Sequence, residues 1–247
     1  MEGLTGIIMA AGRGVRLGEL TQDKPKPLMQ VAGVELIRFG LAFLRDLGVE
    51  KRIVVTGYGA EALSSVVRQF DPECELIHND EYLKGSATTL ERALAKVDGS
   101  FVVMTADHIF RKDIAERAKR QFGGSLTIFI DRDRVLGDDD MKVSLDPGDG
   151  RVLKLSKTLK EYDCGYVGFS YCPKSLIGLV KETIGEAEDV FGPSANLEHV
   201  WQRMADMGQR IETADISGSR WLEVDFPEEL ARATEEVSNN SSFYNHL

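Results

Sequence analysis

The chain has 247 residues, 43% hydrophobic and 28% charged, which is the composition of a globular protein long enough to bury its own core. Forty acidic residues outnumber 30 lysines and arginines, and the net charge of −10 disfavours nucleic acid and anionic membranes as partners. The three cysteines have no CxxC spacing, so they predict neither a disulfide framework nor a zinc site and suit a reducing cytoplasm. The longest uncharged stretches are far shorter than the roughly 20 residues of a membrane-spanning helix, and no secretion signal is expected.

Short β-branched runs alternate with amphipathic stretches through the first half of the chain. The predicted strands cover 6–10, 53–57, 76–79 and 101–106, and the predicted helices cover 36–47, 61–70, 87–97 and 112–122. This alternation predicts a parallel sheet that is covered on both faces. In such a sheet the binding site lies at the carboxyl ends of the strands.

The second half begins with a predicted strand at 125–130, followed by a hairpin of 141–145 and 151–155 joined by the turn 146–150. Further elements are a strand at 165–171, helices at 173–184 and 195–207, a strand pair around Ile211 and Trp221, and a helix at 227–237. We therefore expect one α/β domain over 1–237, with a mixed, mostly parallel sheet flanked by helices and a β-hairpin excursion. The polar stretch 238–247 is predicted to be a mobile tail or a junction to an absent domain.

The segment after the first predicted strand, residues 9–33, reverses the charge of the chain. Four cations fall within fourteen residues that contain only two acids, which suggests an anionic ligand. Gly12 and Gly14 remove side chains where the backbone approaches that ligand, leaving N–H groups to line a phosphate-binding concavity. The cations are Arg13, Arg16, Lys24 and Lys26, and the acids are Glu19 and Asp23.

Three other interpretations compete for this loop. A dinucleotide fingerprint needs a third glycine three residues after Gly14 and a helix start, whereas here Gly18 is displaced and two prolines follow. A Walker loop needs Gly-Lys-Ser/Thr, which does not occur in this loop. A plain turn with solvated cations would explain any one of these residues, but it explains their joint spacing poorly.

The pattern Gly12-x-Gly14-x-Arg16-Leu17, followed by Pro25-Lys26-Pro27-Leu28, resembles the nucleotide-binding loop of nucleoside-triphosphate transferases of the sugar-nucleotide pyrophosphorylase superfamily. Later landmarks of that superfamily follow in order at 84–90, 104–108, 150–157 and 221–230, so the resemblance covers about 5–237. It implies a Rossmann-like nucleotidyltransferase fold, similar to glycosyltransferase-A folds. It also implies a Mg²⁺-dependent reaction in which an acceptor phosphate attacks the α-phosphorus and expels pyrophosphate.

The resemblance also implies a set of site residues. Arg16 and Lys26 would hold the triphosphate as the catalytic cations, and Asp107 and Asp225 would bind Mg²⁺. The nucleotide would contact Ala10, Ala11, Gly12, Arg13, Gly14, Gly85, Ser86 and Thr89, and the acceptor would contact Lys157, Asp163, Gly165 and Tyr166.

Structural alternatives stay open for several of these residues. Asp107, Asp225 or Ser86 could instead cap the helix that follows, and Lys157 and Lys142 could be solvated strand lysines. His108 is expected to pack or hydrogen-bond beside Asp107. The loop cations are expected to be exposed and to add little to stability.

Within the superfamily, the landmarks look most like the CTP-dependent enzymes that activate inositol 1-phosphate, with phosphocholine cytidylyltransferases nearly as similar. The chain departs from the inositol-phosphate pattern at Ala106 and at Gly165-Tyr166. We expect a cytoplasmic enzyme that makes a CDP-alcohol from CTP and a small phosphorylated alcohol. The alternatives are a sugar-1-phosphate or phosphonate nucleotidyltransferase, a glycosyltransferase, and a noncatalytic sensor subunit. A homodimer or a fusion to a second enzyme domain is left open.

Overall fold

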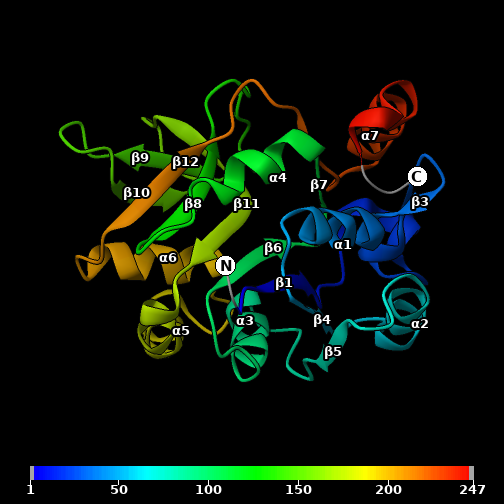
Figure 1. Ribbon diagram of the computed structural model, residues 1–247, viewed down its shortest axis with the longest axis horizontal. Helices are drawn as coiled ribbons and strands as arrows, with labels where there is room; N and C mark the ends of the chain where they lie inside the picture. Colours follow the sequence, from blue (N-terminus) through cyan, green and yellow to red (C-terminus); the bar gives the residue numbers. More distant parts are fainter. Residues whose placement is uncertain (1–2, 245–247) are drawn as a thin grey trace.

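The computed structural model describes residues 3–244 and is built on a nine-stranded mixed sheet (Figure 1). Seven strands run side by side in the order β12 (Ile211–Asp215), β8 (Leu126–Asp131), β11 (Cys164–Cys172), β6 (Phe101–Thr105), β1 (Thr5–Ala10), β4 (Lys51–Thr56) and β5 (Glu75–His78). The pairs β1–β4, β1–β6, β4–β5 and β8–β12 are parallel, and only β11 runs against its neighbours in this row. The prediction of a mixed, mostly parallel sheet is therefore confirmed.

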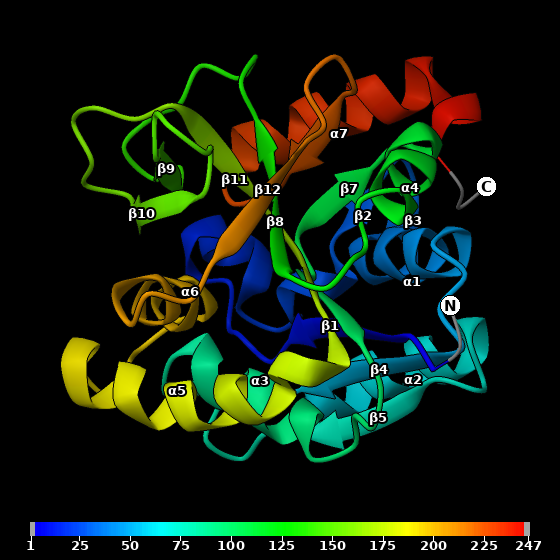
Figure 2. The same ribbon diagram turned by 60° about the vertical axis from the view of Figure 1, so that its left-hand side comes forward.

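Helices cover both faces of this sheet, as Figure 1 and Figure 2 show. One face packs on α1 (Leu36–Asp46), α2 (Ala60–Phe70) and α4 (Lys112–Lys119), and the other on α3 (Ser86–Leu94), α5 (Ile177–Phe191) and α6 (Leu197–Asp206). Because both faces are covered, the central strands are apolar on both sides, and β1 is buried along its whole length.

The antiparallel strand β11 creates the place for a site. Its C-terminal half pairs with β6, while its first residues pair on the same edge with β9 (Lys142–Leu145), which continues into β10 (Val152–Ser156). Between these two contacts, the pairing of β11 with β8 on the other edge shifts register, and Gly168 adopts a φ of +67°. A side chain at Gly168 would lie 2.7 Å from the imidazole of His108. The sheet is therefore open at this point, and the gap contains polar side chains.

Several short elements were not predicted from the sequence. They are 3₁₀ helices at Val15–Thr21, Lys26–Leu28, Lys174–Leu176 and Ser241–Phe243, the hairpin β2 (Gln30–Val31) and β3 (Val34–Glu35), and the strand β7 (His108–Phe110). The predicted strand pair near Ile211 and Trp221 was wrong as a pair: β12 adds to β8 in the main sheet, whereas β13 (Trp221–Glu223) pairs with β7.

The C-terminal segment packs on the rest of the domain. Helix α7 (Pro227–Asn239) continues two residues beyond 237, and Tyr244 is 2% exposed against a core cluster that includes Leu17 and Phe39. The interpretation of 238–247 as a mobile tail or a junction stays a prediction, and residues 245–247 lie outside the described part. Within residues 3–244, no helix has both the length and the apolar character needed to cross a membrane.

Candidate active site

Two adjoining cavities lie at the carboxyl ends of β1 and β6. The smaller, of about 250 Å³, is lined by Ala10 at the end of β1 and by Gly12 and Gly14 in the loop that follows. The larger, of about 610 Å³, extends into the opening beside β11. Three charged residues, Arg16, Asp107 and Asp225, line both cavities, so the two form one continuous site.

The glycine-rich loop folds tightly over Lys26. Gly14 has a φ of +65°, and a side chain there would lie 2.5 Å from the Cβ of Lys26. The hydroxyl of Thr21 donates to the Gly14 carbonyl at 3.0 Å and fixes the turn. Glycine is therefore required at 14 for both its backbone conformation and its close approach to Lys26.

The predicted triphosphate cations and the predicted metal acids form one ion cluster. The Lys26 ammonium donates to Asp107 Oδ2 at 2.6 Å and also to Asp225 Oδ1. The Arg16 guanidinium lies 2.8 Å from Asp225 Oδ2. The sequence predicted each of the four residues separately, and the structure brings all four together.

Burial and the neighbouring charges act in opposite directions on the pKa values of this cluster. Burial opposes the charge on Asp107, but the neighbouring Lys26 ammonium and His108 imidazole hold the pKa of this carboxyl well below its usual range. Burial likewise disfavours the charge on Lys26, and Asp107 and Asp225 outweigh it and raise the pKa of the ammonium. Lys26 is 8% exposed. The expectation that the loop cations are exposed is therefore wrong for Lys26.

The two aspartates do not cap helices. Asp107 lies in the tight turn between β6 and β7, and Asp225 precedes α7. At the start of α7 the Glu229 carboxylate accepts hydrogen bonds from the backbone N–H groups of Asp225 and Phe226, at 2.7 and 3.2 Å. Because Glu229 satisfies these donors, the Asp225 carboxylate is left to face the cations.

His108 lies directly behind Asp107, as expected. Its Nδ1 is 2.7 Å from both Asp107 Oδ1 and Thr105 Oγ1, and its ring stacks between Phe110 and Trp221. Burial opposes protonation, but the carboxylates of Glu223 and Asp107 raise the pKa of the imidazole overall. The ring is therefore placed to orient the Asp107 carboxylate.

The predicted base-reading strip at the start of α3 is partly occupied by the protein itself. The N–H groups of Gly85 and Ser86 donate to Pro193 O and Asn196 Oδ1, and Ser86 Oγ accepts from the N–H of Leu197. Ser86 lines the larger cavity, but it bonds to α6 and does not cap its own helix.

Three further predicted nucleotide contacts, Thr89, Arg13 and Ala11, do not line either cavity. Thr89 is buried and accepts a hydrogen bond from Asn79, away from both cavities. Arg13 is exposed and leans on the ring of Tyr58, 5.6 Å from its centroid. Ala11 is buried, and its carbonyl accepts from the N–H of Tyr58, so its close packing supports the loop from behind.

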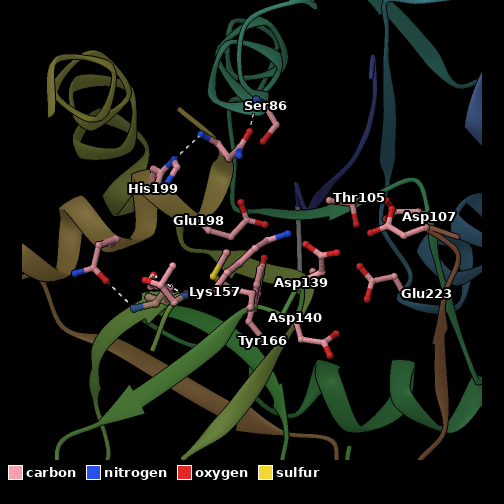
Figure 3. Close-up of a pocket in the computed structure, with 18 of the residues that line it drawn as sticks. Ser86, Thr105, Asp107, Asp139, Asp140, Lys157, Tyr166, Glu198, His199 and Glu223 are labelled. Atoms are coloured by element: carbon pink, nitrogen blue, oxygen red, sulfur yellow. Dashed lines mark hydrogen bonds between the residues drawn. The ribbon is translucent and has the colours of Figure 1, made fainter. Parts of the chain in front are cut away.

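On the predicted acceptor side, Lys157 and Tyr166 line the larger cavity, whereas Asp163 and Gly165 do not (Figure 3). The Asp163 carboxylate accepts from the N–H of Leu145 at 2.7 Å and holds the hairpin. A side chain at Gly165 would lie 2.8 Å from Leu136. In the structure both residues support the strands around the cavity, and the acceptor contacts at Asp163 and Gly165 stay a prediction.

Four acids line the larger cavity beside the ion cluster: Asp139, Asp140, Glu198 and Glu223 (Figure 3). The sequence predicts the aspartates of the 138–140 run near the acceptor, but it gave no indication of Glu198 or Glu223. Glu198 opens onto the cavity but is surrounded by protein, and this burial raises the pKa of its carboxyl, partly offset by the Lys157 ammonium. Burial also raises the pKa of Glu223 against the opposing effect of His108. Glu223 could have been found, because it lies two residues before Asp225 and alternation puts both on one face of an extended segment. Glu198 lies alone among the apolar positions of a predicted helix, and no pattern in the sequence indicates that it faces a cavity.

The mixed sheet, with a glycine-rich loop and two aspartates at the carboxyl ends of its strands, is that of a nucleotidyltransferase fold. Residues 6–137 match the model of the MobA-like NTP transferase domain, and the chain belongs to this family. The structure resembles the inositol-1-phosphate CTP transferase of T. maritima, with a TM-score of 0.81, 22% identity and 96% of each chain covered. It also resembles the CTP:phosphocholine cytidylyltransferase of Streptococcus pneumoniae, with a TM-score of 0.71, 22% identity, and 95% of this chain and 99% of that chain covered.

One curated relative, the bifunctional IPC transferase and DIPP synthase of Aquifex aeolicus, is 28% identical over 93% of this chain and 50% of its own length. The chain spans about half the length of the first curated relatives that it matches. The likeness therefore concerns one part of those longer proteins.

Proposed function

We propose that the chain is a cytidylyltransferase that joins CTP to a small phosphorylated polyol, such as inositol 1-phosphate, and releases pyrophosphate. The observation that carries this proposal is the pair of continuous cavities that share Arg16, Asp107 and Asp225. One cavity has a glycine-rich anion loop and the other has Lys157. The names of the longer relatives and of the structural neighbours support the same chemistry.

In this mechanism the triphosphate occupies the smaller cavity, where Lys26 and Arg16 turn toward its oxygens. The acceptor phosphate enters the larger cavity and is held by Lys157. One of its oxygens forms a bond to the α-phosphorus as the bond from that phosphorus to the β-phosphate oxygen breaks, and pyrophosphate leaves. The acceptor oxygen is already anionic near neutral pH, so no general base is required.

We propose Mg²⁺ as the cofactor, held by Asp107 and Asp225. Both carboxylates converge on a single cation, the Lys26 ammonium, and hard carboxylate oxygens suit Mg²⁺. Within residues 3–244, no group of three or more His, Cys, Asp or Glu side chains is arranged to hold a metal. Mg²⁺ is commonly bound by one or two carboxylates and completed by substrate phosphates, so a pair of aspartates fits. The ion would neutralise charge on the phosphates.

The lining of the larger cavity favours a polyhydroxyl acceptor over a quaternary ammonium. Hydroxyl, amide and carboxylate groups converge there from Ser86, Asn196, Glu198, Asp139 and Thr158. These groups both donate and accept hydrogen bonds, as a ring of alcohols requires. Recognition of a trimethylammonium would instead need several aromatic faces around the cation. Phosphocholine is therefore the second candidate acceptor.

Residues 1–237 are proposed to act as one nucleotidyltransferase unit, with a second enzyme activity fused to it or supplied by a partner, or with a second copy forming a homodimer. The double length of the relatives supports the fusion. We also propose the cytoplasm as the compartment, since all three cysteines are free and buried thiols.

The test is a matrix of five nucleoside triphosphates against phosphoinositol, phosphocholine, aminoethylphosphonate and glucose 1-phosphate, with pyrophosphate release as the readout. We expect turnover with CTP and phosphoinositol to exceed all other pairs. Preferred use of UTP with glucose 1-phosphate would replace the proposal by a sugar-nucleotide reaction. Tight CTP binding without any turnover would indicate a noncatalytic sensor.

A further inference from the structure

Lys142 is a buried lysine whose ammonium contacts only neutral partners. It opens β9 and is 6% exposed. Its Nζ donates to three backbone carbonyls, those of Gly137 at 2.6 Å, Lys157 at 2.9 Å and Asp140 at 3.4 Å. A buried ammonium is destabilising unless its donors are satisfied, and here each of the three finds an acceptor.

The three carbonyls belong to separate parts of the cavity wall. Gly137 and Asp140 lie at the two ends of the acidic loop that carries Asp139, and Lys157 follows β10. Asp139, Asp140 and Lys157 all line the larger cavity (Figure 3). One side chain therefore ties the acidic loop to the backbone of the candidate phosphate-binding lysine.

The strand that carries Lys157 depends on such side-chain contacts. β10 is at the edge of the sheet and has β9 as its strand neighbour on one side. On its open side, the N–H of Leu155 donates to the buried Gln202 Oε1 at 2.6 Å, and Gln202 belongs to the same helix as Glu198. Lys142 and Gln202 thus fix the end of β10 from opposite sides.

We propose that Lys142 is a positioning residue that sets the separation between Lys157 and the Asp139–Asp140 loop, and thereby determines which phosphorylated alcohols the cavity accepts. This inference rests on the proposed function. The ammonium does not face the substrate; it acts through the three carbonyls. An apolar side chain of similar length fills the same space but leaves three carbonyls without a donor and the two segments unconnected.

The first experiment compares Lys142→Met with Lys160→Met, which makes the same chemical change at an exposed lysine outside the cavities. For Lys142→Met we expect the acceptor KM to rise about 10- to 100-fold, the scale of one or two lost hydrogen bonds, with the CTP KM within about twofold. The selectivity for phosphoinositol over smaller phosphates is expected to fall. Lys160→Met keeps both constants. Equal changes in both KM values, or unchanged values, would overturn the inference.

Two more variants distinguish a positioning role of Lys142 from a general loss of folded protein. Gln202→Met loosens β10 from the other side and is expected to raise the acceptor KM in the same selective way. Lys142→Arg keeps the charge, but its planar fork does not match three carbonyls around one nitrogen, so we expect partial rescue. A purely structural role for Lys142 would lower the amount of folded enzyme and leave both KM values unchanged.

Hydrogen exchange tests the same inference without turnover. In Lys142→Met we expect faster amide exchange in both 137–141 and 156–160, with unchanged exchange in 5–10. Unchanged exchange in the two segments would refute the tether. If the wild type transfers cytidylyl groups to no acceptor, the proposed function fails while this measurement still decides whether Lys142 joins the loop to the strand.

Discussion

At the scale of single residues, the sequence predicted which charged residues belong to the site, but it did not predict how they pair. The charge reversal of the loop indicated an anionic ligand, and the resemblance to nucleotidyltransferases implied that Arg16 and Lys26 bind it and that Asp107 and Asp225 bind the metal. Nothing in the sequence indicated that the cations bind the acids directly, because that depends on how residues far apart in the chain meet. Arg16 and Lys26 consequently differ: the Arg16 side chain is 41% exposed and that of Lys26 only 10%.

Alanine at either cation is expected to lower turnover by about two to three orders of magnitude, the scale for losing one fixed charge stabiliser. The two variants differ in stability. Lys26→Ala leaves the buried Asp225 and the half-buried Asp107 without their shared ammonium and is expected to lower the free energy of unfolding by about 3–5 kcal/mol. Arg16→Ala is expected to change it by less than about 1 kcal/mol. Kinetics and urea unfolding measure both effects, with Lys24→Ala as the control; equal stability losses would contradict the burial argument.

Removal of divalent metal is expected to abolish activity, and added Mg²⁺ to restore it. Neither aspartate caps a helix, so asparagine cannot substitute for a capping role in either case. Asp107→Asn and Asp225→Asn each remove a hard anionic ligand together with the charge that pairs with Lys26. We expect both variants to need much more Mg²⁺ for half-maximal turnover. Full wild-type turnover in excess EDTA would sink the proposed metal role.

Glu198 gives a pH prediction. Burial raises the pKa of its carboxyl above the ordinary 4.5, so the folded protein holds this proton more tightly than the unfolded chain does. Stability from this group is present below pH 4.5 and is lost as pH rises through the raised pKa. Glu198→Gln is therefore expected to be more stable than the wild type at pH 8, with a difference that shrinks toward pH 4.5.

Urea unfolding at several pH values measures the Glu198 effect, and the exposed Glu182→Gln serves as the control. A stability difference that does not depend on pH would show that the Glu198 charge is not buried. The same Glu198 variant is expected to raise the acceptor KM. A buried charge that lines a cavity and lowers the stability of the fold is typical of a ligand-binding residue.

At the scale of elements, periodicity predicted the long helices and the central strands but not the short pieces between them. β7 and β13 have three residues each, too few for an alternating pattern, and they pair across more than a hundred residues of sequence. These two strands fix Asp107 and Glu223 relative to each other. The part of the site that rests on a contiguous motif was thus predictable, and the part that rests on long-range pairing was not.

Gly85 shows how a motif residue can serve the structure first. A Cβ at this position would lie 1.7 Å from the Ala195 carbonyl oxygen, so the 193–196 segment must move away in Gly85→Ala. That segment leads into α6, which carries Glu198. We therefore expect a loss of about 1–3 kcal/mol in stability and a rise in the acceptor KM. Gly178→Ala, at a helical glycine with no contact within 4 Å, is expected to stabilise the fold slightly. Comparable effects in the two variants would contradict this account.

At the scale of the whole molecule, the topology supports the proposal that the chain is one cooperative unit, although the family match ends at 137. The strand β8 lies before that boundary, but its two neighbours, β11 and β12, both come after it. β6 likewise has β11 along one edge. The residues after 137 therefore complete the sheet and supply Asp225, Lys157 and Glu198 to the site.

A fragment ending at 137 is accordingly expected not to fold. It would leave β8 without a strand neighbour and expose one edge of β6, although both strands are buried in the full chain. In the full chain, fluorescence reports only on Trp201 and Trp221, which lie beyond 137, whereas far-UV circular dichroism reports on every helix and strand. We expect urea unfolding followed by these two probes to give coincident single transitions. A cooperatively folded 1–137 fragment, or two separate transitions, would show two independent units and refute the single-domain proposal.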